Sequence, residues 1–128
     1  MPVYRHDELP IHDVPRIRTR ILVSQELGAT ETAVWEQWID EGGYIPLHYH
    51  EVEEVLVLLD GRVELTIDDE VSIAVAPATV VVSPQQVHGL KPADSTPIHL
   101  MAFFPTATPE IFSPDGTQRK KPWEDTDG

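Results

Sequence analysis

One short stretch of the chain, "YIPLHYHEVEEVLVLLDG" from Tyr44 to Gly61, places two histidines and a carboxylate beside an apolar run. His48 and His50 are separated by one residue. Because successive side chains of a strand point to opposite faces, both imidazoles would project from the same face. Imidazole nitrogens and carboxylate oxygens are ligands that proteins offer to divalent transition metals. The pair therefore indicates two nitrogen ligands for one metal ion, and Glu54 could add an oxygen ligand.

A straight strand cannot bring Glu54 to the histidines. At roughly 3.3 Å per residue, His48 and Glu54 would lie about 20 Å apart, much farther than two ligands of one ion. The polar segment Glu51–Glu53 interrupts two apolar runs and suits a bend or reversal of the chain. We expect two antiparallel strands to bring His48, His50 and Glu54 together. Another glutamate of Glu51–Glu53 would replace Glu54 if the bend differs.

The rest of the chain has the pattern of short strands. Apolar and β-branched runs recur between Gly, Pro and Asp, and no window keeps helical periodicity for three turns. Strands are expected over Arg16–Val23, Thr32–Ile39, Glu54–Asp60, Arg62–Asp68, Val71–Ala76, Thr79–Pro84 and Pro97–Pro105. This many short strands without crossover helices predict an all-β fold, an antiparallel sandwich or barrel.

The two ends of the chain differ from this strand-rich middle. Residues 1–15 contain three prolines and are expected to form an extended arm. Residues 113–128 form a polar tail rich in Pro and Gly, which Trp123 could dock onto the rest of the protein. Residues 16–112 would then be one β-barrel domain, since 128 residues suit a single core.

Composition excludes several classes of function. The chain has no cysteine, so disulfides, thiolate metal sites and cysteine nucleophiles are absent. Its formal charge of −13, from 22 acidic and 9 basic residues, argues against binding nucleic acid. No apolar run approaches the roughly 20 residues that span a bilayer. The amino terminus has charges where a signal peptide needs an apolar segment, so we expect a cytoplasmic protein without membrane or nucleic-acid partners.

The spacing around the histidines resembles the first sequence motif of the cupin superfamily. Gly42 lies six residues before His48. Glu54 follows His50 by four residues, and Gly61 follows Glu54 by seven. Every fixed position of that motif is matched. The resemblance implies a small single-domain cupin, whose fold is an antiparallel double-stranded β-helix or jelly-roll barrel.

The family's second motif is matched less closely. "PATVVVSPQQVHGL" occupies its place and offers His88 as the fourth ligand. Pro77 stands where the family has a leading glycine, Gln85 replaces a second glycine, and Pro92 replaces a terminal asparagine. What remains is a valine-rich strand, a turn proline and the histidine. These departures concern the geometry of the turn more than the ligand.

The resemblance implies that His48, His50, Glu54 and His88 hold one divalent transition metal inside the barrel. This set of nitrogen and oxygen donors suits Mn, Fe, Ni, Co, Cu or Zn and leaves two octahedral positions open. The implied activity is a dioxygenase, isomerase or lyase acting on a small organic acid, carbonyl compound or sugar derivative, with no catalytic residue that can be named. The alternative is a non-catalytic module that binds a metal or a small ligand. The family also implies a homodimer.

Other polar and aromatic residues have two possible places. His99 could line the pocket or lie on the outer face of its strand. Trp35 and Gln37 share one face of the expected strand Thr32–Ile39, while Glu36 and Trp38 share the other. One of these pairs is expected to face the cavity.

Overall fold

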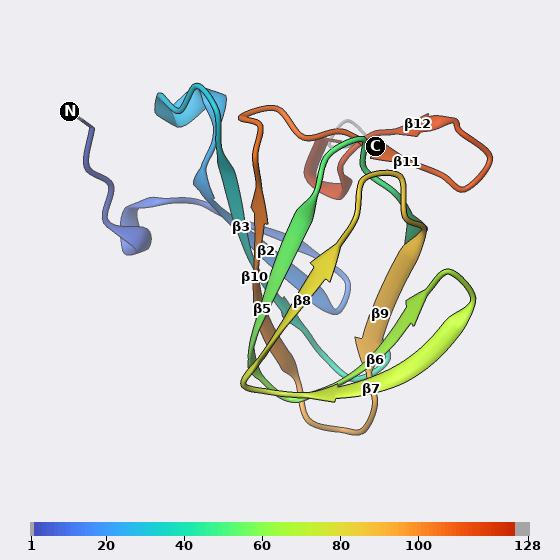
Figure 1. Ribbon diagram of the computed structural model, residues 1–128. Helices are drawn as coiled ribbons and strands as arrows, with labels where there is room; N and C mark the ends of the chain where they lie inside the picture. The colour runs from blue at the N-terminus through green and yellow to red at the C-terminus, as the bar shows by residue number, and fades with distance from the viewer. Residues whose placement is uncertain (1, 125–128) are drawn as a thin grey trace.

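The computed structural model describes residues 2–124, which form two facing antiparallel sheets and a small hairpin (Figure 1). The larger sheet has six strands in the order β1-β2-β3-β10-β5-β8, and the smaller has four in the order β4-β9-β6-β7. The hairpin pairs β11 with β12. The strands are β1 (Ile11–Val14), β2 (Ile17–Val23), β3 (Ala33–Ile39), β4 (Ile45–His48), β5 (Glu54–Asp60), β6 (Arg62–Ile67), β7 (Glu70–Val75), β8 (Ala78–Val82), β9 (His88–Pro92), β10 (Ile98–Phe104), β11 (Ile111–Phe112) and β12 (Gln118–Arg119).

Alternation of side chains between the two faces of each strand builds the core. In β10 every second residue from Ile98 to Phe104 is buried, and β5 shows the same alternation from Glu54 to Leu58. Leu58, Ile98 and Leu100 are completely buried between the sheets. The all-β jelly-roll fold predicted from the sequence is confirmed.

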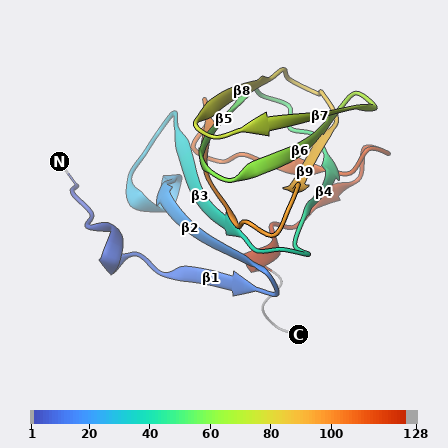
Figure 2. The same cartoon turned by 90° about the horizontal axis from the view of Figure 1, so that it is seen from below.

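The seven strands predicted from the sequence all form, within a few residues of the expected ends. Between residues 1 and 15, Ile11–Val14 forms β1, which pairs with β2 at the edge of the larger sheet (Figure 2). Residues 6–8 form a 3₁₀ turn, η1 (His6–Glu8), and a second turn, η2 (Gln25–Leu27), follows β2. The described residues contain no helix long and apolar enough to cross a lipid bilayer.

The last described residues return to the end of the sandwich that holds the β11–β12 hairpin (Figure 1). After β12 the chain forms a 3₁₀ turn, η3 (Pro122–Glu124), whose Trp123 packs against the main core. The Trp123 and Trp35 rings meet edge to face with centroids 5.0 Å apart. Residues 118–124 therefore form part of the wall of the barrel.

Candidate metal centre

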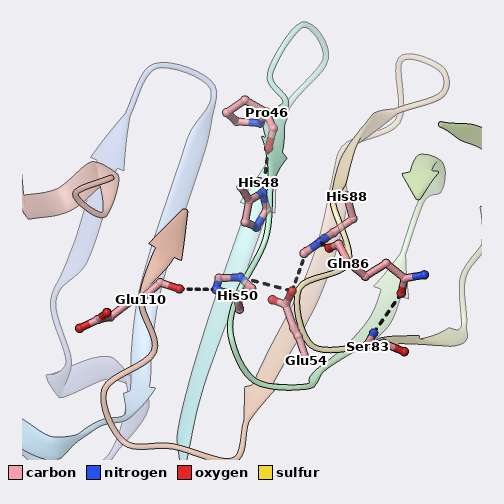
Figure 3. A network of polar contacts seen from close by, with 8 residues as sticks. All are labelled: Pro46, His48, His50, Glu54, Ser83, Gln86, His88 and Glu110. Atoms are coloured by element: carbon pink, nitrogen blue, oxygen red, sulfur yellow. Dashed lines mark hydrogen bonds and ion pairs between the residues drawn. The ribbon is translucent and has the colours of Figure 1, made fainter. Parts of the chain in front are cut away.

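The four residues expected to bind a metal lie together inside the barrel (Figure 3). His48 ends β4, His50 follows two residues later, Glu54 begins β5 and His88 begins β9. One ligand atom from each lies within 4.8 Å of those of the other three. Their exposed fractions are only 2–6%. This cluster of three imidazoles and one carboxylate is able to bind a divalent metal.

Strand pairing and one bend produce this arrangement. His48 on β4 is the direct partner of His88 on β9 in the antiparallel register, so their side chains share a face. After His50 the chain bends at residues 51 and 52, and β5 then starts at Glu54. The bend lies within the segment Glu51–Glu53 where the sequence predicts it. Glu51 and Glu53 are exposed, which leaves Glu54 as the glutamate of the cluster.

Backbone carbonyl groups orient all three imidazoles. The Nδ1 atom of His48 lies 2.8 Å from the Pro46 carbonyl oxygen, and that of His88 lies 2.9 Å from the Gln86 carbonyl oxygen. The Nδ1 atom of His50 lies 2.7 Å from the carbonyl oxygen of Glu110. A carbonyl oxygen only accepts, so each Nδ1 carries a proton and donates it. The Nε2 atom of each ring is thereby directed toward the centre of the cluster, which is how proteins orient metal-binding histidines.

The inward-facing atoms fit a bound cation. Nε2 of His88 lies 2.8 Å from Oε1 of Glu54, while Nε2 of His50 lies 3.5 Å from the same oxygen. The longer contact is not a hydrogen bond, and Nε2 of His50 is a buried polar atom without a partner among the described residues. An unpaired buried polar atom is costly. A metal ion shared by these atoms would satisfy His50 and would bring the donors of all four residues to one point.

Burial and mutual repulsion keep two of the imidazoles neutral. Burial, followed by the neighbouring His88 and His50, lowers the pKa of His48 to about 3. Burial likewise lowers the pKa of His50, against the attraction of Glu54. Neutral imidazole is the form that binds a metal, so both rings are ready to bind throughout the physiological pH range.

His88 and Glu54 are in direct contact, and each shifts the pKa of the other. Burial alone would lower the pKa of His88, but the hydrogen bond to Glu54 and its negative charge together raise it. Burial alone would raise the pKa of Glu54, but the His88 hydrogen bond and the nearby imidazoles hold that pKa below its usual value. The contact therefore favours the ionised carboxylate of Glu54 and the protonated form of His88.

A cavity of about 280 Å³ opens directly onto the cluster. Most of its wall is apolar, and Gln37 and Tyr44 add neutral polar groups. Gln37 donates a hydrogen bond to the hydroxyl oxygen of Thr19, 3.1 Å away. Arg119 and Lys120 are the basic side chains of the wall. Its apolar residues are Ile17, Trp35, Ile45, Pro46, Leu56, Leu90, Ile111, Pro122 and Trp123.

The structure decides between the two faces of β3. Trp35 and Gln37 line the cavity, whereas Glu36 and Trp38 lie on the outer face. His99 on β10 also lies outside the cavity. Its Nε2 hydrogen-bonds Glu36 at 2.8 Å, and its ring stacks on Trp38 at a centroid distance of 5.0 Å. The structure therefore places His99 on the outer face of its strand and not in the pocket.

Two basic residues of the cavity were missed by the sequence reasoning. Arg119 and Lys120 belong to the segment expected to be a polar tail. The signal available was charge: "RKK" at 119–121 holds three of the nine basic residues of a strongly acidic chain. Their place beside the cluster depends on pairing between β11 and β12, and no local sequence pattern predicts that pairing.

Comparison with known proteins agrees with this fold. The sequence profile described as "Cupin domain" matches residues 35–104. No curated protein matches the chain. Among solved structures, the polyketide cyclase RemF from Streptomyces resistomycificus is 18% identical with a TM-score of 0.72, and the alignment covers 82% of this chain and 79% of that one.

Two further solved structures show how widely this fold is used. An RmlC-like cupin from Shewanella frigidimarina is 20% identical with a TM-score of 0.69, covering 82% of this chain and 89% of that one. Bacillus subtilis oxalate decarboxylase, studied for its Mn(II) centres, is 17% identical with a TM-score of 0.76. That alignment covers 86% of this chain and 31% of the decarboxylase. At such identities the similarity establishes the fold and not the reaction.

Proposed function

The chain belongs to the cupin family, and from that premise we propose that it is a metal-dependent enzyme acting on a small organic acid or carbonyl compound. His48, His50, Glu54 and His88 would hold one divalent metal from the group Mn, Fe, Ni, Co, Cu or Zn. The observation that carries the proposal is the common orientation of the three imidazoles, each with Nδ1 bonded to a carbonyl and Nε2 facing the buried centre. The Mn(II) centres of the oxalate decarboxylase neighbour support the same class of cofactor.

The chain's own residues favour a compact substrate with an apolar body. Trp35, Leu56 and Ile111 line the cavity and would exclude water from the bound molecule. Sugar hydroxyl groups would find few partners on the largely apolar wall, where one N–H of the Gln37 amide is already donated to Thr19. When bound, a divalent metal would act as a Lewis acid toward a carbonyl or carboxylate oxygen, as in dioxygenases, isomerases and lyases.

A second candidate is a binding module without catalysis. Among the described residues that line the cavity, no carboxylate or imidazole is present besides the four of the cluster. A proton-transfer reaction would therefore have to use one of those four groups, the phenol of Tyr44 or the amine of Lys120. This scarcity of acid–base groups favours reversible binding of a small ligand as the alternative to turnover.

Elemental analysis of the chain purified without chelator or nickel affinity resin tests the metal site. We expect about one divalent transition metal per chain, lost in a His48→Gln/His50→Gln variant, because two of the four donors are removed. His99→Gln is the matched control, since His99 lies on the outer face and its loss should leave the metal content unchanged. Absence of metal in the wild-type chain after reloading would overturn the proposal.

Turnover distinguishes the enzyme from the binding module. Chelating organic acids and carbonyl compounds would be incubated with the metal-loaded chain, with products and oxygen uptake followed together. Turnover that disappears in His48→Gln/His50→Gln and survives in His99→Gln supports the enzyme. A compound that binds and is recovered unchanged supports the binding module.

The assembly and location of the protein are further parts of this proposal. A homodimer should give a mass of about twice 14.4 kDa in light scattering after size exclusion. A cytoplasmic location should appear in fractionated cells as recovery with the cytosolic fraction. A monomeric mass, or recovery elsewhere, would contradict the corresponding part.

A further inference from the structure

The β11–β12 hairpin directs Arg119 toward the metal cavity. Arg119 is the direct antiparallel partner of Ile111, and partners across a strand pair share one face. Ile111 is buried in the core and lines the cavity. Arg119 and the following Lys120 line it as well. Two basic side chains thus stand in the wall of the cavity that holds the metal cluster.

This hairpin is attached to the cluster itself. The carbonyl of Glu110, immediately before β11, accepts the Nδ1 proton of His50 at 2.7 Å. The aromatic rings of Tyr49 and Phe112 stack at a centroid distance of 5.3 Å, and their backbones exchange hydrogen bonds. The position of Arg119 relative to the metal ligands is therefore set by a continuous series of backbone contacts.

Among the described residues, Arg119 and Lys120 form no close ion pair with a carboxylate, although Lys120 lies near enough to Glu124 to help lower the pKa of that carboxyl group. Over residues 2–124 no carboxylate oxygen lies within 4 Å of a charged nitrogen of Arg119 or Lys120, whereas Lys121 pairs with Glu124 at 3.4 Å. Apart from Glu54, which is hydrogen-bonded to His88, the described cavity wall has no acidic side chain. The chain as a whole has a formal charge of −13, so two cations without a close ion pair among residues 2–124 give this largely apolar cavity wall an unusual local positive charge.

From this geometry we infer that Arg119 and Lys120 form an anion-binding subsite, and that the ligand is an organic carboxylate with an apolar body. The inference rests on the proposed function and specifies its substrate class. The guanidinium of Arg119 suits a carboxylate, because its planar donors match the two oxygens. The apolar body would lie against Trp35 and Trp123, whose rings meet at the cavity wall. The carboxylate at this subsite is distinct from any oxygen that the metal binds.

Two probes of the same shape test the subsite. 2-Naphthoate carries a negative charge and 2-naphthamide is neutral, so their difference in affinity measures recognition of the charge. Isothermal titration calorimetry would be run on the metal-loaded chain and on the chain stripped with chelator. We expect naphthoate to bind about tenfold more tightly than naphthamide in both forms, the size typical of one charge-assisted contact.

A charge-matched pair of variants locates the subsite. In Arg119→Gln/Lys120→Gln the preference for naphthoate should fall to within about twofold, with metal content and thermal midpoint unchanged. Arg62→Gln/Lys91→Gln removes the same charge at residues whose partners are Asp94 and Glu64, outside the cavity wall. This control should keep the full preference.

Three outcomes would overturn the inference. These are failure of naphthoate to bind the wild-type chain, equal binding of the two probes, and a preference that survives in Arg119→Gln/Lys120→Gln. A preference present only in the metal-loaded chain would place the carboxylate on the metal, which overturns the subsite and supports the metal centre. If the wild-type chain binds no metal even after reloading but still prefers naphthoate, the subsite is supported and the proposed metal-dependent enzyme is contradicted.

Discussion

The turn before β9 contains a strained residue that a single substitution should relieve. Gln85 has a positive φ of 65°, in the left-handed region, and stands where the second cupin motif has a glycine. Its side chain is exposed, and its backbone N–H donates to the His50 carbonyl oxygen at 2.7 Å. Gln85→Gly removes the crowded Cβ atom and keeps this hydrogen bond.

The expected gain is the difference between two opposing effects. A non-glycine residue in the left-handed conformation costs roughly 1–2 kcal/mol. Glycine also gives the unfolded chain more freedom, which removes roughly 0.4–1 kcal/mol of stability. We therefore expect Gln85→Gly to raise the free energy of unfolding by about 0.5–1 kcal/mol.

Urea unfolding of the metal-free chain measures this change. Gln85→Ala retains the Cβ atom and loses the rest of the side chain, so its stability should equal that of the wild type. Asp69→Gly is a second control, because Asp69 has a similar φ of 68° but aspartate tolerates this conformation better and should gain less. Equal stabilisation by Gln85→Ala and Gln85→Gly would refute the argument from backbone strain, as would destabilisation by glycine.

Two further predictions concern the cluster and the β5–β6 turn. Because the pKa of His48 is lowered from 6.5 to about 3 on folding, below pH 6.5 the unfolded chain binds a proton that the folded chain does not. Urea unfolding of the metal-free chain should therefore show a fall in the free energy of unfolding between pH 7 and pH 5 that is about 2 kcal/mol larger than the fall in His48→Gln. Equal falls in the two proteins would contradict this prediction. Gly61 has a φ of 101°, and a Cβ atom added there would lie 2.8 Å from the Pro97 carbonyl oxygen. Gly61→Ala should lower the free energy of unfolding by at least about 2 kcal/mol in the same measurement. A change under about 0.5 kcal/mol would show that the turn adjusts to the added Cβ atom.

The parts of the site that are close in sequence could be predicted. The spacing of His48, His50 and Glu54, together with the polar interruption between them, predicted a bend that the structure contains. His88 was identified although its surrounding motif has lost both glycines. The structure explains this tolerance at one position, since Gln85 adopts the left-handed conformation that the missing glycine would favour.

The parts that depend on distant contacts could not be predicted. The carbonyl that orients His50 belongs to Glu110, sixty residues away, and a backbone oxygen leaves no signature in the sequence. The place of Arg119 depends on pairing of two strands of only two residues each. Local patterns determine which residues can share a strand face, whereas the return of the last segment to the barrel depends on the packing of Trp123 against Trp35.

Charge is distributed in opposite senses outside and inside this protein. The acidic surface repels an approaching anion, but salt limits that repulsion to a distance of about 10 Å at 0.1 M ionic strength. With a divalent metal bound as proposed, the carboxylate of Glu54 would neutralise only half of its charge, and Arg119 and Lys120 in the cavity wall would add to the remainder. An organic anion would therefore gain electrostatic energy only after it has entered the cavity. The shape of the apolar cavity, more than long-range steering, should decide which carboxylates bind.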